Sequence, residues 1–464
     1  MSERVWSPSS WRDKPLAQAV TYEDPQALED ALARLRALPP LVTSWEIERL
    51  KQQLQDAAEG KRFVLQGGDC AETLADCRSD VVVAKLKILL QMSLVLIYGL
   101  RKPVVRIGRL AGQYAKPRSQ PHESKDGVTL PSYFGDLVNR REFTPSSRRA
   151  DPELLLHGYM HAALTLNFVR SLAAAGFADL QHPEQWDLAF ASRRDLDEDL
   201  RAGYTNLTRT MRDALAFMEA LGERSVTELG RVEFFTSHEG LNLHYEEAQT
   251  RTVPRRSGAY DLTTHLPWIG ERTRALDGAH IEFFRGISNP VGVKLGPSTS
   301  REDACALAEA LNPQREPGKL VLITRMGKAN VARVEPLLRA LADTGQPVVW
   351  LVDPMHGNTR ATASGAKTRD VADIWAEITG TLEAHARAGT HLAGVHFELT
   401  GDDVTECVGG EVSEADLDRN YATVCDPRLN YRQSLELAFS MARWFAASSD
   451  LRSSVAVVGA SCPG

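Results

Sequence analysis

Cysteine is scarce in this chain, and no two cysteines form a close pair. Six cysteines are spread over 464 residues, at positions 70, 77, 305, 407, 425 and 462, without a C-x-x-C motif. This pattern fits neither a zinc ribbon nor a small disulfide-linked scaffold. Any metal site must therefore be assembled from segments that are distant in the sequence.

Long apolar runs and an excess of positive charge are also missing. The first residues, MSERVWSPSSW, lack the basic start and apolar run of a secretory signal, so we expect a cytoplasmic protein. The most apolar stretch, residues 88–100, contains Gln91 and Ser93 and is shorter than the ~20 residues that span a bilayer, which indicates a buried helix. The net charge of −7 argues against a nucleic-acid or membrane partner bound through overall charge.

Two helices are expected in residues 1–60, as an N-terminal helical extension. Asp24 and Pro25 suit the cap and first turn of a helix, which the two prolines at 39 and 40 end. Thr43 and Glu46 form a capping-box pattern that starts a second amphipathic helix. No repeat with a period of about 20–50 residues is present, so the chain lacks the sequence signature of a repeat architecture.

Eight short apolar runs from residue 63 onward predict eight strands. They are residues 63–66, 104–107, 232–235, 268–269, 291–293, 320–323, 348–352 and 395–397. Helical stretches such as 303–311, 331–344 and 371–388 separate most of them, and continuous apolarity is typical of parallel strands that helices cover. The pattern predicts an α/β protein with a (β/α)8 TIM barrel over residues 61–445, although an open doubly wound sheet would give similar strand signals.

The spacing of these runs predicts two additions to the barrel. Residues 110–231, between strands 2 and 3, are too many for one βα unit, so we expect inserted helices at about residues 150–230. Residues 446–464 are rich in serine and are expected to form a flexible C-terminal tail.

Cationic side chains follow several of the predicted strands. Barrel enzymes place their chemistry at the carboxyl ends of the strands, where this sequence has Arg109, Arg272, Lys294 and Arg325, joined by Lys116 and Arg118 after the second strand. Converging cations would repel one another unless they held an anion, and guanidinium groups match phosphate or carboxylate oxygens. We therefore expect a multiply anionic ligand.

Metal-ligating side chains occupy the same ends of the strands. Cys70, His356 and Glu398 follow predicted strands, and Asp426 lies on the segment after the last one. A thiolate, an imidazole and two carboxylates suit a divalent transition ion better than Mg or Ca, without selecting one metal. His396, two residues before Glu398, is either a partner of the ligands or a core histidine. Cys425 precedes Asp426, so we expect its sulfur to lie near that of Cys70.

The motifs that carry these residues resemble the type II 3-deoxy-D-arabino-heptulosonate 7-phosphate (DAHP) synthase family from about residue 6 to residue 445. The chain contains, in this order, QGGDCAE, RLAGQYAKPRS, WIGERTR, NPVGVKLGP, RMG, DPMHGNT, KTRD, TGDDVTEC and CDPRLN. The resemblance implies a (β/α)8 barrel that condenses phosphoenolpyruvate (PEP) with erythrose 4-phosphate and water, releasing phosphate, in the first step of the shikimate pathway.

The resemblance also implies roles for individual residues. The metal ligands would be Cys70, His356, Glu398 and Asp426. The PEP-binding set would be Arg109, Glu271, Arg272, Lys294 and Arg325. Lys116, Arg118 and Ser119 would receive erythrose 4-phosphate. Lys116, Cys70 and His356 are the residues that we expect to act in catalysis. The cofactor would be a divalent ion, Mn or Co, with Fe, Zn and Cd as further candidates.

Regulation and partners are also expected from the resemblance: self-association into a homo-oligomer, a chorismate mutase partner and an aromatic effector. The chain departs from the family pattern at Phe134, where arginine is usual, and at Asp403, where asparagine is usual. Two alternatives therefore stay open. One is a specialised-metabolism relative that makes DAHP or an aminated analogue for an antibiotic or phenazine-type pathway, and the other is a catalytically silent binding or regulatory homologue.

Overall fold

Eight parallel strands close into a barrel in the computed structural model, which describes residues 6–174 and 233–459 and a few single positions between 198 and 209. Around the barrel the order is β1-β14-β11-β10-β9-β8-β5-β2, with β2 pairing back onto β1. The strands are β1 (Phe63–Gly68), β2 (Val104–Arg109), β5 (Phe235–Glu239), β8 (Leu266–Ile269), β9 (Val291–Leu295), β10 (Leu320–Thr324), β11 (Val348–Val352) and β14 (Leu392–Glu398). The (β/α)8 prediction is confirmed, and an open sheet is excluded.

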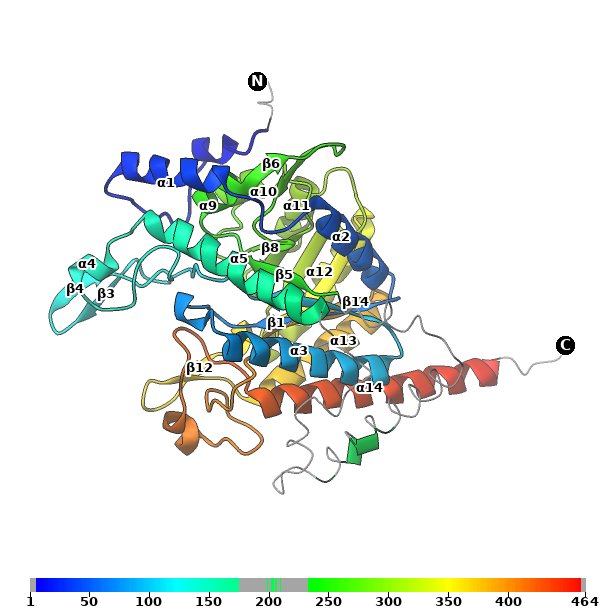
Figure 1. The fold of residues 1–464 in the computed structure, drawn as a ribbon. Coiled ribbons are helices and arrows are strands. Elements are labelled where there is room, and N and C mark those ends of the chain that lie inside the picture. The colour runs from blue at the N-terminus through cyan, green and yellow to red at the C-terminus, as the bar shows by residue number, and fades with distance from the viewer. Residues whose placement is uncertain are drawn as a thin grey trace.

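Helices cover the outside of this barrel, as Figure 1 shows. The longer ones that follow the strands are α3 (Ser79–Leu100), α11 (Arg301–Leu311), α12 (Val334–Thr344), α13 (Val371–Ala388) and α14 (Tyr431–Gly459), with the shorter α9 (Leu243–Gln249) and α10 (Ala279–Phe284). By length and composition α3 could cross a membrane, but most of it is buried inside the molecule. It packs along α14 so closely that a Cβ at Gly99 would lie 2.3 Å from the Cβ of Ala442. The predicted buried helix is thus a core helix.

The barrel interior is filled by side chains that alternate along the strands. Val105 and Ile107 of β2 and Val321 and Ile323 of β10 belong to one apolar cluster inside the barrel. Because side chains alternate with a period of two, the next inward positions at the carboxyl ends fall on Arg109 and Arg325. The alternation of side chains along the strands therefore places cations at the mouth of the barrel.

Both N-terminal helices are present, as α1 (Pro25–Ala37) and α2 (Ser44–Ala58). The side chain of Asp24 caps α1, and Thr43 and Glu46 form the predicted capping box of α2. Leu50 and Leu54 of α2 join the apolar cluster inside the barrel. Helix α2 therefore packs on the core of the barrel and is more than an appended segment.

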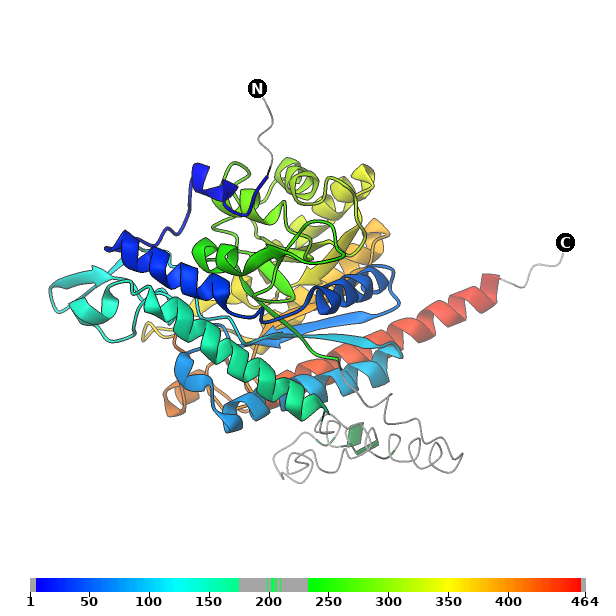
Figure 2. The ribbon, with the colours of Figure 1, turned by 45° about the horizontal axis from the view of Figure 1, so that its top comes forward.

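The insertion after β2 begins with a hairpin that sequence reasoning did not predict. It consists of β3 (His122–Lys125) and β4 (Val128–Pro131) and is followed by α4 (Pro145–Arg148) and the long α5 (Glu153–Ala174), which crosses in front of the barrel in Figures 1 and 2. Two shorter hairpins join β6 (Thr250–Thr252) to β7 (Ala259–Asp261) and β12 (Arg360–Ala361) to β13 (Lys367–Thr368). The rest of the predicted insertion, from residue 175 to residue 230, lies almost wholly outside the described residues.

The expected bounds of the third strand were wrong. The third strand is β5, which spans Phe235–Glu239, whereas the predicted run was 232–235. Apolarity did not mark this strand, because most of its buried side chains are polar. The flexible tail expected at residues 446–464 stays a prediction, and α14 extends to Gly459. Residues 431–458 contain neither proline nor glycine, so nothing in the local sequence ends the helix at 445.

Candidate active site

A cavity of about 470 Å³ opens at the carboxyl ends of the strands. Its lining includes Arg109, Lys116, Arg118, Ser119, Glu239, Trp268, Glu271, Arg272, Lys294, Arg325, His356, Lys367, Cys425 and Asp426. Every residue expected to bind PEP or erythrose 4-phosphate lies in this lining, together with two of the four expected metal ligands. The other two, Cys70 and Glu398, are fully buried directly behind it.

Arg109 and Lys294 form the deepest cationic part of the cavity. Both side chains are buried and face the Trp268 ring, with the Arg109 guanidinium 5.1 Å and the Lys294 ammonium 5.9 Å from its centroid. Lys294 also forms an ion pair with Asp353. Burial is the main cause that lowers the pKa of Lys294 to about 8, despite that carboxylate. An anion that enters here would meet cations already held in place.

Further cations come from the loops after β2, β8 and β10. Arg325 forms an ion pair with Glu271, and Arg272 donates a hydrogen bond to the Ser119 hydroxyl over 2.8 Å. Arg118 lies 3.8 Å from Glu123 of the β3–β4 hairpin. The two expected substrate sets therefore meet at Arg272 and Ser119 in one continuous cavity.

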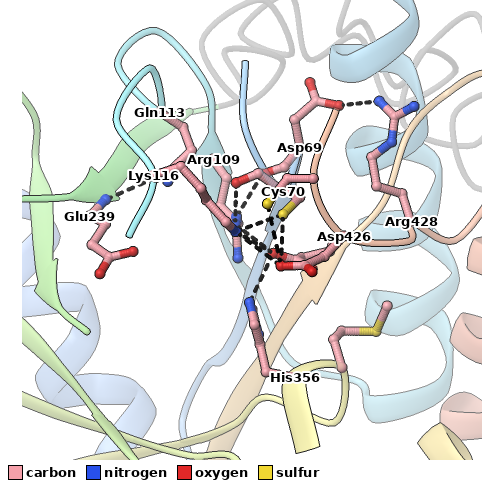
Figure 3. A network of polar contacts seen from close by, with 12 residues as sticks. Asp69, Cys70, Arg109, Gln113, Lys116, Glu239, His356, Asp426 and Arg428 are labelled. Carbon is pink, nitrogen blue, oxygen red and sulfur yellow. Dashed lines mark hydrogen bonds and ion pairs between the residues drawn. The ribbon is translucent and has the colours of Figure 1, made fainter. Parts of the chain in front are cut away.

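The expected metal ligands converge behind the cationic side chains of the cavity. The Nε2 atom of His356 lies 3.0 Å from Glu398 Oε1, and with Asp426 these side chains place three ligand atoms within 4.8 Å of one another. The Sγ atom of Cys70 lies 3.5 Å from Asp426 Oδ2. Figure 3 shows Cys70, His356 and Asp426 pointing toward one another. Soft and hard donors that converge in this way fit a divalent transition ion.

His356 is oriented by a carboxylate that is not itself among the expected ligands. Asp353 accepts a hydrogen bond from His356 Nδ1 over 2.6 Å, which leaves Nε2 facing Glu398. A carboxylate behind the ring is a common support for a metal-binding histidine, because it fixes the ring and the tautomer. Asp353 thus joins the expected metal set to Lys294 of the expected PEP set.

Lys116 lies at the centre of the polar network drawn in Figure 3. Its Nζ atom is 2.7 Å from Cys70 Sγ, 3.3 Å from Asp426 Oδ2 and 3.9 Å from Glu398 Oε1. Burial opposes the charge of Lys116, but the surrounding sulfur and carboxylate groups raise the pKa of Lys116 well above its usual value. The lysine therefore balances the negative charge of the ligand set.

Glu398 is held ionised although it is completely buried. Arg109 donates to its Oε1 over 3.0 Å and Arg369 donates to its Oε2 over 2.7 Å. Burial raises the pKa of this carboxyl, but His356 and the two arginines outweigh that effect and keep it well below its usual value. Glu398 can therefore offer a carboxylate to a cation.

A model of the Class-II DAHP synthetase family matches residues 6–442. The chain belongs to this family.

Three curated relatives carry the name phospho-2-dehydro-3-deoxyheptonate aldolase. The protein from Neurospora crassa is 47% identical over 456 residues, which cover 94% of each chain. The one from Streptomyces coelicolor is 48% identical over 440 residues, covering 94% of this chain and 97% of its own. AroG of Mycolicibacterium smegmatis is 44% identical over 437 residues, covering 92% of each. The protein is thus an enzyme of the Class-II DAHP synthetase family.

Several site residues of this family member were missed by sequence reasoning. Asp353 and Arg369 lie in the motifs DPMHGNT and KTRD, so the motifs were noticed but the supporting roles of these two residues were not. Trp268 and Glu239 occupy inward positions at the ends of β8 and β5, and the two-residue period could have identified them. Lys367, whose Nζ atom lies 2.8 Å from Asp426 Oδ1, is the first residue of the same KTRD motif, and its contact with an expected metal ligand was also missed.

The two histidines near the strand ends lie outside the ligand set. His396 contacts Arg109, with 2.6 Å between its Nε2 and Nη1 of the arginine, and it packs edge-on against Trp268. It is therefore a neighbour of the expected PEP set. His238 faces Glu246 across 3.0 Å and does not line the cavity.

Proposed function

We propose that this enzyme condenses PEP with erythrose 4-phosphate and water to give DAHP and phosphate, using a divalent metal ion. The observation that carries the proposal is one cavity in which two cationic groups adjoin a convergent set of metal-ligating side chains. A substrate with one phosphate and a carboxylate fits the deep group around Arg109 and Lys294. A second phosphate fits the outer group around Arg118 and Ser119.

The reaction requires one carbon–carbon bond and one carbon–oxygen bond to form and a second carbon–oxygen bond to break. The methylene carbon of PEP attacks the aldehyde carbon of the sugar phosphate, water adds to the PEP carbon that bears the phosphate, and phosphate leaves with the bridging oxygen. When bound, a divalent ion supplies Lewis-acid polarisation of a carbonyl oxygen. Cys70, His356, Glu398 and Asp426 would hold that ion.

The remaining residues would position the substrates and stabilise charge. Arg109, Lys294 and Arg325 would hold the PEP anion and neutralise the departing phosphate. Lys116, whose ammonium faces Cys70 and Asp426, is placed to donate a proton to the alkoxide that forms on the former aldehyde. Arg118 and Ser119 would bind the phosphate of the acceptor, and Arg272 of the PEP set donates to Ser119 where the two groups meet. Trp268 covers one side of the deep group.

The test is phosphate release from PEP and erythrose 4-phosphate by metal-free protein with and without Mn or Co, with the product identified by mass spectrometry. We expect no turnover in EDTA, recovery with Mn or Co, and the mass of DAHP. Turnover with an aminated analogue of erythrose 4-phosphate, offered in place of the sugar phosphate, would support the specialised-metabolism alternative. Absence of turnover with every divalent metal would overturn the proposal and favour the silent homologue.

A matched variant pair separates site chemistry from general charge effects. Lys294→Met removes a buried cation from the cavity, whereas Arg339→Met removes an exposed one on α12 that pairs with Glu335. We expect activity to collapse in the first variant and to persist in the second. Self-association, a chorismate mutase partner and an aromatic effector stay predictions of the resemblance, and a cytoplasmic location stays a prediction from the N-terminal sequence.

A further inference from the structure

A second set of three metal-ligating side chains overlaps the first. Cys70, Cys425 and Asp426 place their ligand atoms within 4.8 Å of one another, as His356, Glu398 and Asp426 do. The two sets share Asp426, and Cys425 belongs to neither the expected ligands nor the expected substrate sets. The site therefore contains one more soft donor than the four expected ligands supply.

The spacing of the second set suits tetrahedral coordination. Asp426 Oδ2 lies 3.5 Å from Cys70 Sγ and 3.7 Å from Cys425 Sγ. In a tetrahedral site with metal–sulfur bonds of ~2.3 Å and metal–oxygen bonds of ~2.0 Å, neighbouring sulfur and oxygen ligands are about 3.5 Å apart. The three side chains therefore need little movement to bind one ion.

A short turn holds Cys425 in this position. The Thr423 hydroxyl accepts a hydrogen bond from Cys425 N over 3.2 Å and donates one to Asp426 O over 2.8 Å. Cys425 also lines the main cavity, so an ion can reach it. Cationic groups face both sulfurs, Lys116 at 2.7 Å from Cys70 and Arg118 at 3.9 Å from Cys425. Cations at these positions complement the negative charge that two thiolates and a carboxylate carry when they hold an ion.

We propose that the site has two overlapping binding modes, in which thiophilic ions such as Zn²⁺ and Cd²⁺ are bound through Cys70, Cys425 and Asp426. Harder ions such as Mn²⁺ use His356, Glu398 and Asp426 with Cys70. The inference rests on the proposed metal dependence and deepens it. Thiolate ligands select soft ions, whereas carboxylate and imidazole ligands suit harder ones. Because the modes share Asp426 and Cys70, Cd²⁺ and Mn²⁺ exclude each other.

The test is a titration of reduced, metal-free full-length protein with Cd²⁺, followed by the ultraviolet absorption of cadmium thiolate bonds. We expect the wild type to show the intensity of two thiolates, and Cys425→Ser and Cys70→Ser to show about half of it. Cys425→Ser should also bind Cd²⁺ at least about tenfold more weakly. Its affinity for Mn²⁺, measured by electron paramagnetic resonance, should stay within about twofold of the wild type.

Two controls keep the outcomes distinct. Cys305→Ser removes a thiol on α11 that donates to Ala340 O, outside the cavity, and should leave the titration unchanged. His356→Ala should weaken Mn²⁺ binding and keep both thiolate bonds to Cd²⁺.

A one-thiolate signal in the wild type, or a two-thiolate signal in Cys425→Ser, would overturn the two-mode inference. The wild-type spectrum decides even if the variants fail to fold. Absence of Mn²⁺ binding by the wild type would instead overturn the proposed metal dependence.

Discussion

Arg325 and Arg118 line the same cavity but come from different loops, after β10 and β2 respectively. Their separation in the fold lets single substitutions test which substrate each one contacts. Arg325 lies beside Glu271, and Arg118 beside Glu123 of the hairpin. Substituting one arginine at a time can therefore test which of the two expected anion sites each arginine belongs to.

We expect Arg325→Ala to weaken the use of PEP and Arg118→Ala to weaken the use of erythrose 4-phosphate. Each loses charge-assisted hydrogen bonds of about 1.5–3 kcal/mol, which corresponds to about 10- to 150-fold in kcat/KM for that substrate. Steady-state kinetics with each substrate varied in turn measures the effect. Equal losses for both substrates in either variant would contradict this assignment to two anion sites.

We expect Cys70 and Cys425 to act as a redox pair if no metal protects them. A hydrogen bond between the two sulfurs is the main cause that lowers the pKa of Cys425 to about 7, so its thiolate is accessible near neutral pH. In air, oxygen would accept the two electrons released when the two thiols join as a disulfide. That bond would remove the ligand Cys70.

Metal-free protein is therefore expected to lose activity in air and to recover it with a thiol reductant, whereas bound Mn should slow the loss. Peptide mapping without reduction should find a fragment that joins residues 70 and 425. The Cys305→Ser variant should form the same bond. Two free thiols after inactivation would show that this redox reading is wrong.

At the scale of whole elements, Glu377 of α13 links two of the loops that build the site. Its Oε1 atom accepts hydrogen bonds from the backbone N–H groups of Met326 and Gly327, over 2.7 and 2.9 Å. Its Oε2 atom accepts one from the side chain of Asn358 over 2.8 Å. The first loop carries Arg325 and the second carries His356. One buried carboxyl group therefore fixes an expected PEP residue relative to an expected metal ligand.

Glu377→Ala should lower the free energy of unfolding by about 2–4 kcal/mol, because it leaves buried N–H groups without an acceptor. It should also raise the KM for PEP and weaken Mn²⁺ binding together, since both loops lose the same support. Glu377→Gln keeps one acceptor oxygen. It should therefore change the free energy of unfolding, the KM for PEP and the affinity for Mn²⁺ by less than Glu377→Ala does. Denaturant unfolding and Mn²⁺ titration measure these effects. A change confined to one loop would contradict the linking role.

Lys319 is a buried lysine whose protonation affects the stability of the whole molecule. It precedes β10, at the end of the barrel opposite the cavity, and donates to the carbonyl oxygens of Ile287 and Asn289. Burial is the main cause that lowers the pKa of Lys319 from 10.5 to about 7. A neutral amine still has two N–H groups, which match these two carbonyls.

Between pH 7 and pH 10.5, the unfolded chain thus binds more protons at this lysine than the folded chain does. The contribution of Lys319 to the free energy of unfolding therefore rises with pH through this window. Wild type and Lys319→Met should be compared by denaturant unfolding at several pH values, since subtraction removes the other titrating groups. The difference, wild type minus variant, should increase with pH by a few kcal/mol. A flat or falling difference would contradict the prediction.

Local patterns in the sequence determined most of the barrel strands and the starts of the N-terminal helices. Apolar runs located seven of the eight barrel strands, and Asp24, Thr43 and Glu46 located the starts of α1 and α2. These features depend on neighbours within a few residues, which a single sequence displays. The rule that chemistry follows strand ends then selected Arg109, Lys294 and His356, which the structure brings to one region.

Only the tertiary structure decided what depends on contacts between distant segments. Closure rests on β1 pairing with β14, more than 320 residues away, and no local period encodes that pairing. The bounds of β5 were not predicted, because its sequence FTSHE is mostly polar. The surrounding barrel buries these side chains all the same. The contacts of Asp353 with His356 and Lys294, of Arg369 with Glu398 and of Cys425 with Cys70 likewise exist only in three dimensions. Chain folding sets these distances, so residue types alone could suggest the site's chemistry but not its geometry.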